Sequence, residues 1–159
     1  MRIEVRLALF AIFLAFASAA ILPPPAFADP TDACAVLTAA QVSSAIGIPV
    51  KEGTHPTPDF LRTCTWIPSN QTQIKAVTFY IQSANSYDAA KRLLQQSGMK
   101  DTSVGGVGDD AYFQTVGTNS SLVGKKGNTA FKVAIYTTLP VDKAQAMEKT
   151  LAVQALSKF

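Results

Sequence analysis

Alternating apolar and polar residues mark the strands of this chain. In residues 76–82, Val77, Phe79 and Ile81 fall on one predicted face, and the polar residues between them fall on the other. A period of two is typical of a strand with one face buried. The same signal predicts strands over residues 62–68, over 111–116, and in both arms of a hairpin over 120–137 that turns near Lys126–Asn128.

Three segments have helical periodicity instead. Thr38 and Gln41 have the spacing of a capping box, so a helix is predicted from Thr38 until Gly47 and Pro49 end it. A second helix is predicted over residues 85–98 and a third from Pro140 to the end of the chain. For the second helix we expect Ser86 as the N-cap and a buried stripe of Ala90, Leu93, Leu94 and Ser97.

The order of these elements is α-β-β-α-β-β-β-α. Short turns join most of the strands, which favours an antiparallel sheet over a parallel one. The predicted fold class is therefore α+β, with an antiparallel sheet of about five strands and three helices on one face. Residues 29–159 are long enough to form a single domain of this kind.

The first 28 residues have the layout of a secretory signal peptide. Arg2 and Arg6 precede an apolar run over residues 7–22, and Ala26 and Ala28 provide the small residues of a cleavage site. The run is shorter than the roughly 20 residues that span a bilayer. We expect cleavage after Ala28 and a periplasmic or secreted protein with no transmembrane segment after cleavage.

Charge argues against a nucleic-acid partner. The whole chain has 14 basic and 11 acidic side chains, and the signal segment takes two basic residues and one acidic residue of these. The remaining balance is 12 minus 10, or +2, and no basic cluster exceeds two adjacent residues.

Cys34 and Cys64 are the two cysteines, and an even count in an exported chain predicts a disulfide between them. A metal or redox site is disfavoured because the cysteines are far apart and not in a C-x-x-C spacing. His55 is the one histidine and lies in a proline-rich loop, so we expect neither a metal site nor a catalytic base there. No cofactor is predicted.

The stretch "GGVGDDAY" at 105–112 contains a G-x-G-x-x-A pattern. A dinucleotide site needs a strand before this pattern and a helix after it, whereas here a strand follows. We therefore expect a loop in which Gly106 and Gly108 adopt positive φ. The adjacent carboxylates Asp109 and Asp110 keep one alternative open, a hydrolase acting from the Gly105–Asp110 loop.

The strand phases also predict a polar and aromatic sheet face turned away from the helices. Tyrosine and glutamine on such a face could contact a protein or an extended ligand. The alternative is that tyrosine is simply favoured on the solvent side of strands. The candidate partner-binding residues are Tyr80, Tyr112, Tyr136, Gln82, Gln114 and Lys132.

Four stretches of the chain together resemble small exported bacterial domains of unknown function. The stretches are "DACAVLTAAQVSSAIGIPV", "CTW", "VGGVGDDAYF" and "LVGKKGNTAFKVAIY". Many of those domains are envelope lipoproteins of actinobacteria. The resemblance covers about residues 32–157 and implies location and fold but no catalytic residue. This chain has no lipid-attachment cysteine, which implies a periplasmic or secreted form. The residues on the pattern are Cys34, Cys64, Gly106, Gly108, Asp109, Ala111 and Tyr112.

These observations favour a non-enzymatic exported domain that binds a protein partner or a ligand in the cell envelope. Besides the hydrolase, a second alternative is an inhibitor of another exported protein.

Overall fold

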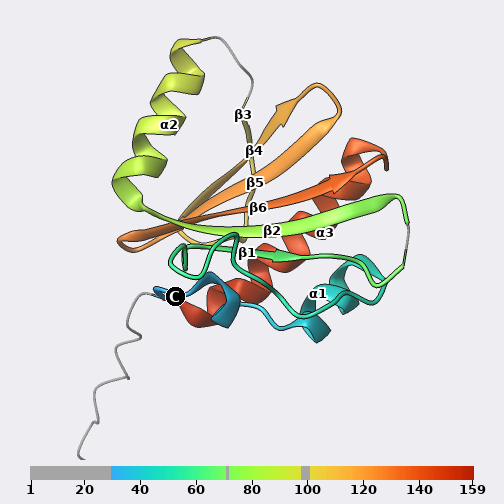
Figure 1. The fold of residues 1–159 in the computed structure, drawn as a ribbon. Coiled ribbons are helices and arrows are strands. Elements are labelled where there is room, and N and C mark those ends of the chain that lie inside the picture. The colour runs from blue at the N-terminus through green and yellow to red at the C-terminus, as the bar shows by residue number, and fades with distance from the viewer. Residues whose placement is uncertain (1–29, 71, 98–100) are drawn as a thin grey trace, which may run out of the picture.

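One antiparallel sheet forms the centre of the molecule (Figure 1). The computed structural model describes residues 30–70, 72–97 and 101–159, so the predicted signal segment lies outside the described residues. The six strands lie in the order β1-β2-β6-β5-β4-β3. They are β1 (Thr63–Trp66), β2 (Ile74–Ser83), β3 (Asp101–Ser103), β4 (Asp110–Val116), β5 (Asn119–Lys126) and β6 (Thr129–Thr137).

The helices are α1 (Ala39–Ile46), α2 (Ala84–Gln96) and α3 (Val141–Ala155), with short 3-10 turns η1 (Ala33–Ala35) and η2 (Leu156–Lys158). The predicted start and end of α1 are confirmed. The Thr38 hydroxyl accepts from the Gln41 N–H, the Gln41 side chain accepts from the Thr38 N–H, and Gly47 closes the helix at φ 74°.

The main core lies between the sheet and the helices α1 and α3. The predicted inward phase of β2 is confirmed, because Val77, Phe79 and Ile81 are all buried in this core. Phe131 of β6 stacks on Phe79 with ring centroids 5.6 Å apart, and Leu151 of α3 is fully buried in the same core. Burial of large apolar side chains of this kind is the main source of stability in a small domain.

The prediction of about five strands is wrong by one. Residues 101–103 form β3 and pair with β4 through Asp101–Gln114 and Ser103–Tyr112. This edge strand is three residues long and mostly exposed. It therefore lacks the alternating apolar pattern from which strands are recognised.

The prediction that all three helices cover one face is also wrong. α2 packs on the opposite face from α1 and α3, where its Tyr87 and Leu94 form a second core with Tyr112, Val123 and Ala130 (Figure 1). The buried stripe and the N-cap of α2 therefore differ from the prediction. Leu93 is 64% exposed, and Ser83 rather than Ser86 caps the helix by accepting from the Ser86 N–H.

In the described part of the chain, no helix combines the length and the apolar character needed to cross a bilayer.

Candidate functional site

The sheet splits at one end between β5 and β6. The β5–β6 pairing stops at Ser121–Ala134, whereas β4 and β5 stay paired out to Val116–Asn119 and β2 and β6 out to Ile74–Thr137. Figure 1 shows the β4–β5 hairpin diverging from β6 there. We call this end the fork, made of Asn119 and Ser120 on β5 and residues 135–137 on β6. Within the described residues, the strand edges that face each other across the fork have no strand partner there.

Helix α3 contacts both prongs of the fork, which are the end of the β4–β5 hairpin on one side and the end of β6 on the other. The Ile135 N–H, one residue beyond the last β5–β6 pair, donates to Glu148 Oε1 at 3.2 Å. One turn earlier on the helix, Gln145 Nε2 lies 3.4 Å from Thr115 Oγ1 on β4. The Glu148 carboxylate therefore takes the place that a carbonyl of β5 would have in a continuous ladder.

Glu148 is an unusual residue for this position because it is fully buried. Burial raises the pKa of its carboxyl from the ordinary 4.5 to about 7. The Ile135 N–H, the Ser120 hydroxyl and the charge of Lys132 act in the opposite direction and only partly offset it. The Ser120 hydroxyl faces this carboxyl, but among the described residues neither that hydroxyl nor the second oxygen, Oε2, makes a hydrogen bond of ordinary geometry.

A hollow of about 190 Å³ lies at the fork, on the sheet face that α2 leaves open. Val116 and Tyr136 flank it and are 61% and 52% exposed. Lys132 is the charged residue of the lining, and its Nζ lies 3.4 Å from Gln114 Oε1. We call this the fork hollow, and its lining residues are Gln114, Val116, Asn119, Ser120, Ser121, Lys132, Ala134 and Tyr136.

Three of the six candidate partner-binding residues, Gln114, Lys132 and Tyr136, are brought together at the fork hollow. Tyr80 and Gln82 are half-buried on β2 and do not line it. Comparison of the chain with protein families, with curated proteins and with solved structures gave no match. The resemblance to envelope domains therefore stays a prediction.

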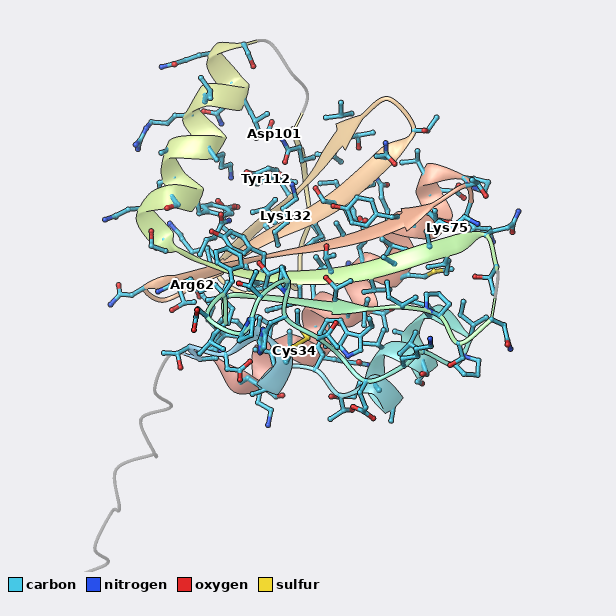
Figure 2. All side chains as sticks on the ribbon, in the orientation of Figure 1. Cys34, Arg62, Lys75, Asp101, Tyr112 and Lys132 are labelled. Carbon is cyan, nitrogen blue, oxygen red and sulfur yellow. A yellow bond between two sulfur atoms is a disulfide. The ribbon has the colours of Figure 1, made fainter. Side chains whose placement is uncertain are left out.

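Tyr112 has a structural role that differs from the expected one. It lies on the predicted face, in one row with Val123, Lys132 and Tyr80, and Figure 2 shows Tyr112 near Lys132. It is nevertheless 1% exposed, because Tyr87 of α2 covers it with ring centroids 5.4 Å apart. Burial raises the pKa of both phenols. Tyr112 therefore anchors α2 and cannot reach a partner.

Two ion pairs fasten α2 to the sheet around these rings. Lys91 Nζ lies 2.6 Å from Asp110 Oδ2, and Lys125 Nζ lies 2.8 Å from Asp88 Oδ1. The hydrogen bond from Lys91 lowers the pKa of Asp110. Both ammonium groups also sit between 5.4 and 5.9 Å from the tyrosine ring centroids, in cation–π range.

The glycine-rich loop is a packed corner of the sheet. Gly106 and Gly108 have φ of 79° and 62°, as expected, and the Asp109 carboxylate accepts from the Gly127 N–H at 2.7 Å. Asp110 instead pairs with Lys91 on α2. The two adjacent carboxylates thus bind different elements, and the geometry gives them no shared proton.

We expect Gly108→Ala to lower the free energy of unfolding by about 2 kcal/mol. Its left-handed φ alone costs a residue with a side chain roughly 1–2 kcal/mol, and a Cβ there would lie 2.3 Å from the Lys125 carbonyl oxygen. Gly105→Ala is the matched control, since its Cβ would meet nothing within 4 Å, and we expect a change within about 0.5 kcal/mol. Urea unfolding of both variants checks this, and equal losses would contradict a packed corner.

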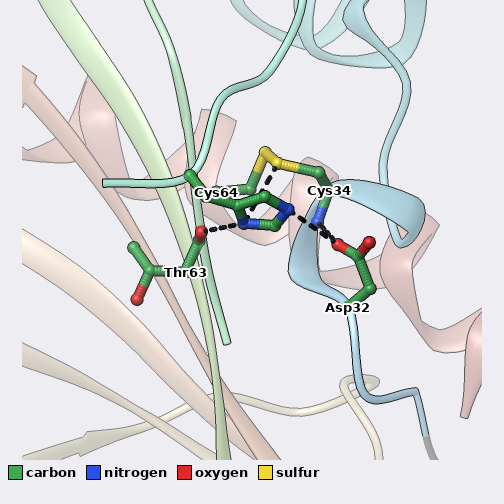
Figure 3. Close-up of a disulfide and its surroundings, with 5 residues drawn as sticks. Asp32, Cys34, Thr63 and Cys64 are labelled. Atoms are coloured by element: carbon green, nitrogen blue, oxygen red, sulfur yellow. Dashed lines mark hydrogen bonds and ion pairs between the residues drawn. A yellow bond between two sulfur atoms is a disulfide. The ribbon is translucent and has the colours of Figure 1, made fainter. Parts of the chain in front are cut away.

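The predicted disulfide joins Cys34 of η1 to Cys64 of β1 (Figure 3). His55 is held beside this bridge by several contacts. Its Nδ1 lies 2.8 Å from the Thr63 carbonyl oxygen and 3.7 Å from Cys34 Sγ, and its Nε2 lies 3.3 Å from Asp32 Oδ1. Asp32, Cys34 and His55 are spaced like metal ligands. A bridged sulfur is not a thiolate, however, so the imidazole serves here to cover the bridge.

Sequence reasoning missed most of the fork. Glu148 had one visible signal, because it falls in the buried stripe of α3 with Ala144, Leu151 and Ala155. An acid within an apolar stripe marks a buried polar contact. The divergence of β5 from β6 had no such signal, since both segments have ordinary strand patterns.

Proposed function

We propose that this protein is a non-enzymatic exported domain that binds an extended segment of a partner protein in the cell envelope, at the fork. The signal-like first 28 residues and the resemblance to envelope domains support export. The disulfide is in keeping with it, because such bridges persist in oxidising compartments.

The observation that carries the proposal is the pair of unpaired strand edges beside a hollow. Among the described residues, Asn119 and Ser120 on one side and residues 135–137 on the other have no β5–β6 pairing, and of their backbone groups the Ile135 N–H is already bound by Glu148. Exposed strand edges of this kind accept an extended peptide by main-chain hydrogen bonds. The exposed Val116 and Tyr136 add apolar contact area at the same place.

The size of the hollow favours a segment of a protein over a whole small molecule. Pockets that enclose drug-sized ligands measure roughly 300–1,000 Å³, and the fork hollow is smaller, at about 190 Å³. It suits one residue of a longer chain. An inhibitor would be one form of this function, since it too would bind a partner protein.

Photo-cross-linking tests the proposal. A benzophenone amino acid is placed at Tyr136 or at Val116, and the protein is irradiated in envelope extract of its source cells. Leu93 on α2 is the matched control, because it is equally apolar and 64% exposed but lies outside the fork hollow. We expect one adduct from positions 116 and 136 that is at least tenfold weaker from position 93.

Mass spectrometry of the adduct then identifies the partner and the cross-linked segment. Folding of each labelled protein is checked by its circular dichroism spectrum. No adduct from either fork position, or the same adduct from position 93, would refute binding at the fork.

A further inference from the structure

The fork hollow contains a cation, Lys132, that forms no ion pair in the described part of the chain. Among the described residues, no carboxylate lies within ion-pair distance of Lys132 Nζ, and its one side-chain contact is the long one to Gln114 Oε1. The other amines near this face differ in this respect, because Lys91 and Lys125 each bind an aspartate. A half-buried ammonium without a partner favours an anionic ligand.

Neutral hydrogen-bond donors surround this cation. The amides of Gln114 and Asn119 and the hydroxyl of Ser121 line the same hollow. The Ser120 hydroxyl is not one of these donors, because its side chain lies on the α3 face of the sheet beside Glu148. The amide and hydroxyl groups of Gln114, Asn119 and Ser121 can donate hydrogen bonds to an anion that the ammonium binds.

The shape of the fork selects the kind of anion. A segment that enters between the prongs meets the Ser121–Ala134 pair, where β5 and β6 join. A segment that ends at this pair would place its last residue at the fork hollow, beside Lys132. The hollow holds about one residue, and a carboxylate is the group with which a chain ends.

We propose that the fork hollow binds the C-terminal carboxylate of the partner segment on Lys132, and that this binding is coupled to uptake of a proton by Glu148. The proposal rests on the function proposed above and specifies the chemistry of its ligand. Capture of a chain terminus by a cation and polar donors is a known mode of peptide recognition.

The coupling follows from the charges around Glu148. Lys132 of β6 is the charged group that stabilises the ionised form of Glu148. The other groups that face it are the Ile135 N–H of β6 and the Ser120 hydroxyl of β5, and α1 has no titratable side chain between Ala39 and Ile46. A ligand carboxylate bound to Lys132 offsets the positive charge that stabilises ionised Glu148. It also brings a second negative charge close to the Glu148 carboxylate. Protonated Glu148 therefore binds the ligand more tightly, and bound ligand raises the pKa of Glu148 by the reciprocal amount.

Titration of the protein with small carboxylates tests both parts. N-acetylglycine mimics a chain terminus, and N-acetylglycinamide is its neutral counterpart. Amide chemical shifts are followed by two-dimensional NMR at pH 5.5 and 8.5 and constant ionic strength. We expect N-acetylglycine to shift Gln114, Ser121 and Lys132 and to bind about fivefold more tightly at pH 5.5, near the lower end of typical coupling between sites. The neutral amide should cause no such shifts.

Three variants separate the contributions. Lys132→Met removes the cation and should abolish binding, whereas Lys132→Arg keeps the charge and should retain it. Glu148→Gln should bind N-acetylglycine with the same affinity at both pH values. A pH dependence that persists in Glu148→Gln would overturn the coupling, and equal binding of the neutral amide would overturn the carboxylate site.

A third ligand tests the terminus itself. The α-amide of N-acetylaspartate offers a side-chain carboxylate, and tighter binding of this ligand than of N-acetylglycine would overturn the assignment to a chain end. If N-acetylglycine binds as expected but no partner cross-links, the carboxylate site stands and the proposed function fails. If a partner cross-links while carboxylates do not bind, the function stands and this inference fails.

Discussion

Removing the Cys34–Cys64 bridge will lower the free energy of unfolding by about 3–4 kcal/mol. The two cysteines are 30 residues apart, and opening a loop of that length returns this much conformational freedom to the unfolded chain. The bridge ties η1 to β1, next to the buried Trp66, so it joins the first ordered segment to an edge strand of the sheet. For a domain whose total stability is about 5–15 kcal/mol, this is a large fraction.

The measurement is urea unfolding of the double variant Cys34→Ala/Cys64→Ala beside the oxidised protein. With a typical dependence of about 1–3 kcal/mol per molar urea, the midpoint should fall by about 2 M. The natural chain under a reducing agent is the matched control, because it opens the same loop without changing any residue. Superimposable unfolding curves for the oxidised and reduced protein would contradict a stabilising role for the bridge.

The elements that the sequence predicted correctly are those whose cause is local. The boundaries of α1 depend on Thr38, Gln41 and Gly47, which lie within ten residues of one another. The buried face of β2 depends on an alternation that any register preserves. The disulfide needed only the count of cysteines and the expectation of export.

The features that could not be predicted depend on contacts distant in sequence. The apolar side of α2 shows that the helix packs on something, but not which face of the sheet it covers. That choice depends on Tyr112, Val123 and Ala130, which make a second apolar patch among polar neighbours. In the same way, Gln114, Lys132 and Tyr136 were candidates from their strand phase, but their meeting at one hollow requires the divergence of β5 from β6.

The buried Glu148 lies at the fork and also affects the stability of the fold. Its replacement should give the second large change in the free energy of unfolding. In the folded protein burial raises the pKa of Glu148 to about 7, against its ordinary 4.5. Below pH 4.5 the carboxyl is protonated in both states, and its full contribution to stability is present. As the pH rises from 4.5 to 7, the unfolded chain releases the proton and the folded protein retains it, so stability falls. The loss is about 3 kcal/mol in total, at roughly 1.4 kcal/mol per pH unit, and is complete above pH 7.

Glu148→Gln should therefore be more stable than the natural protein at pH 8, by up to about 3 kcal/mol, and close to it at pH 4. The glutamine oxygen can still accept from the Ile135 N–H, and its amide N–H can donate to the unpartnered Ser120 hydroxyl.

The check is urea unfolding of both proteins at intervals between pH 4 and 8.5. Asp142→Asn is the control, because Asp142 is an exposed acid on the same helix and its effect should stay within about 1 kcal/mol. Because other groups titrate equally in both proteins, the difference between the two profiles isolates Glu148. Parallel profiles would mean that Glu148 ionises alike in the folded and unfolded states, and the carboxylate behind the fork would then not take up a proton near neutral pH.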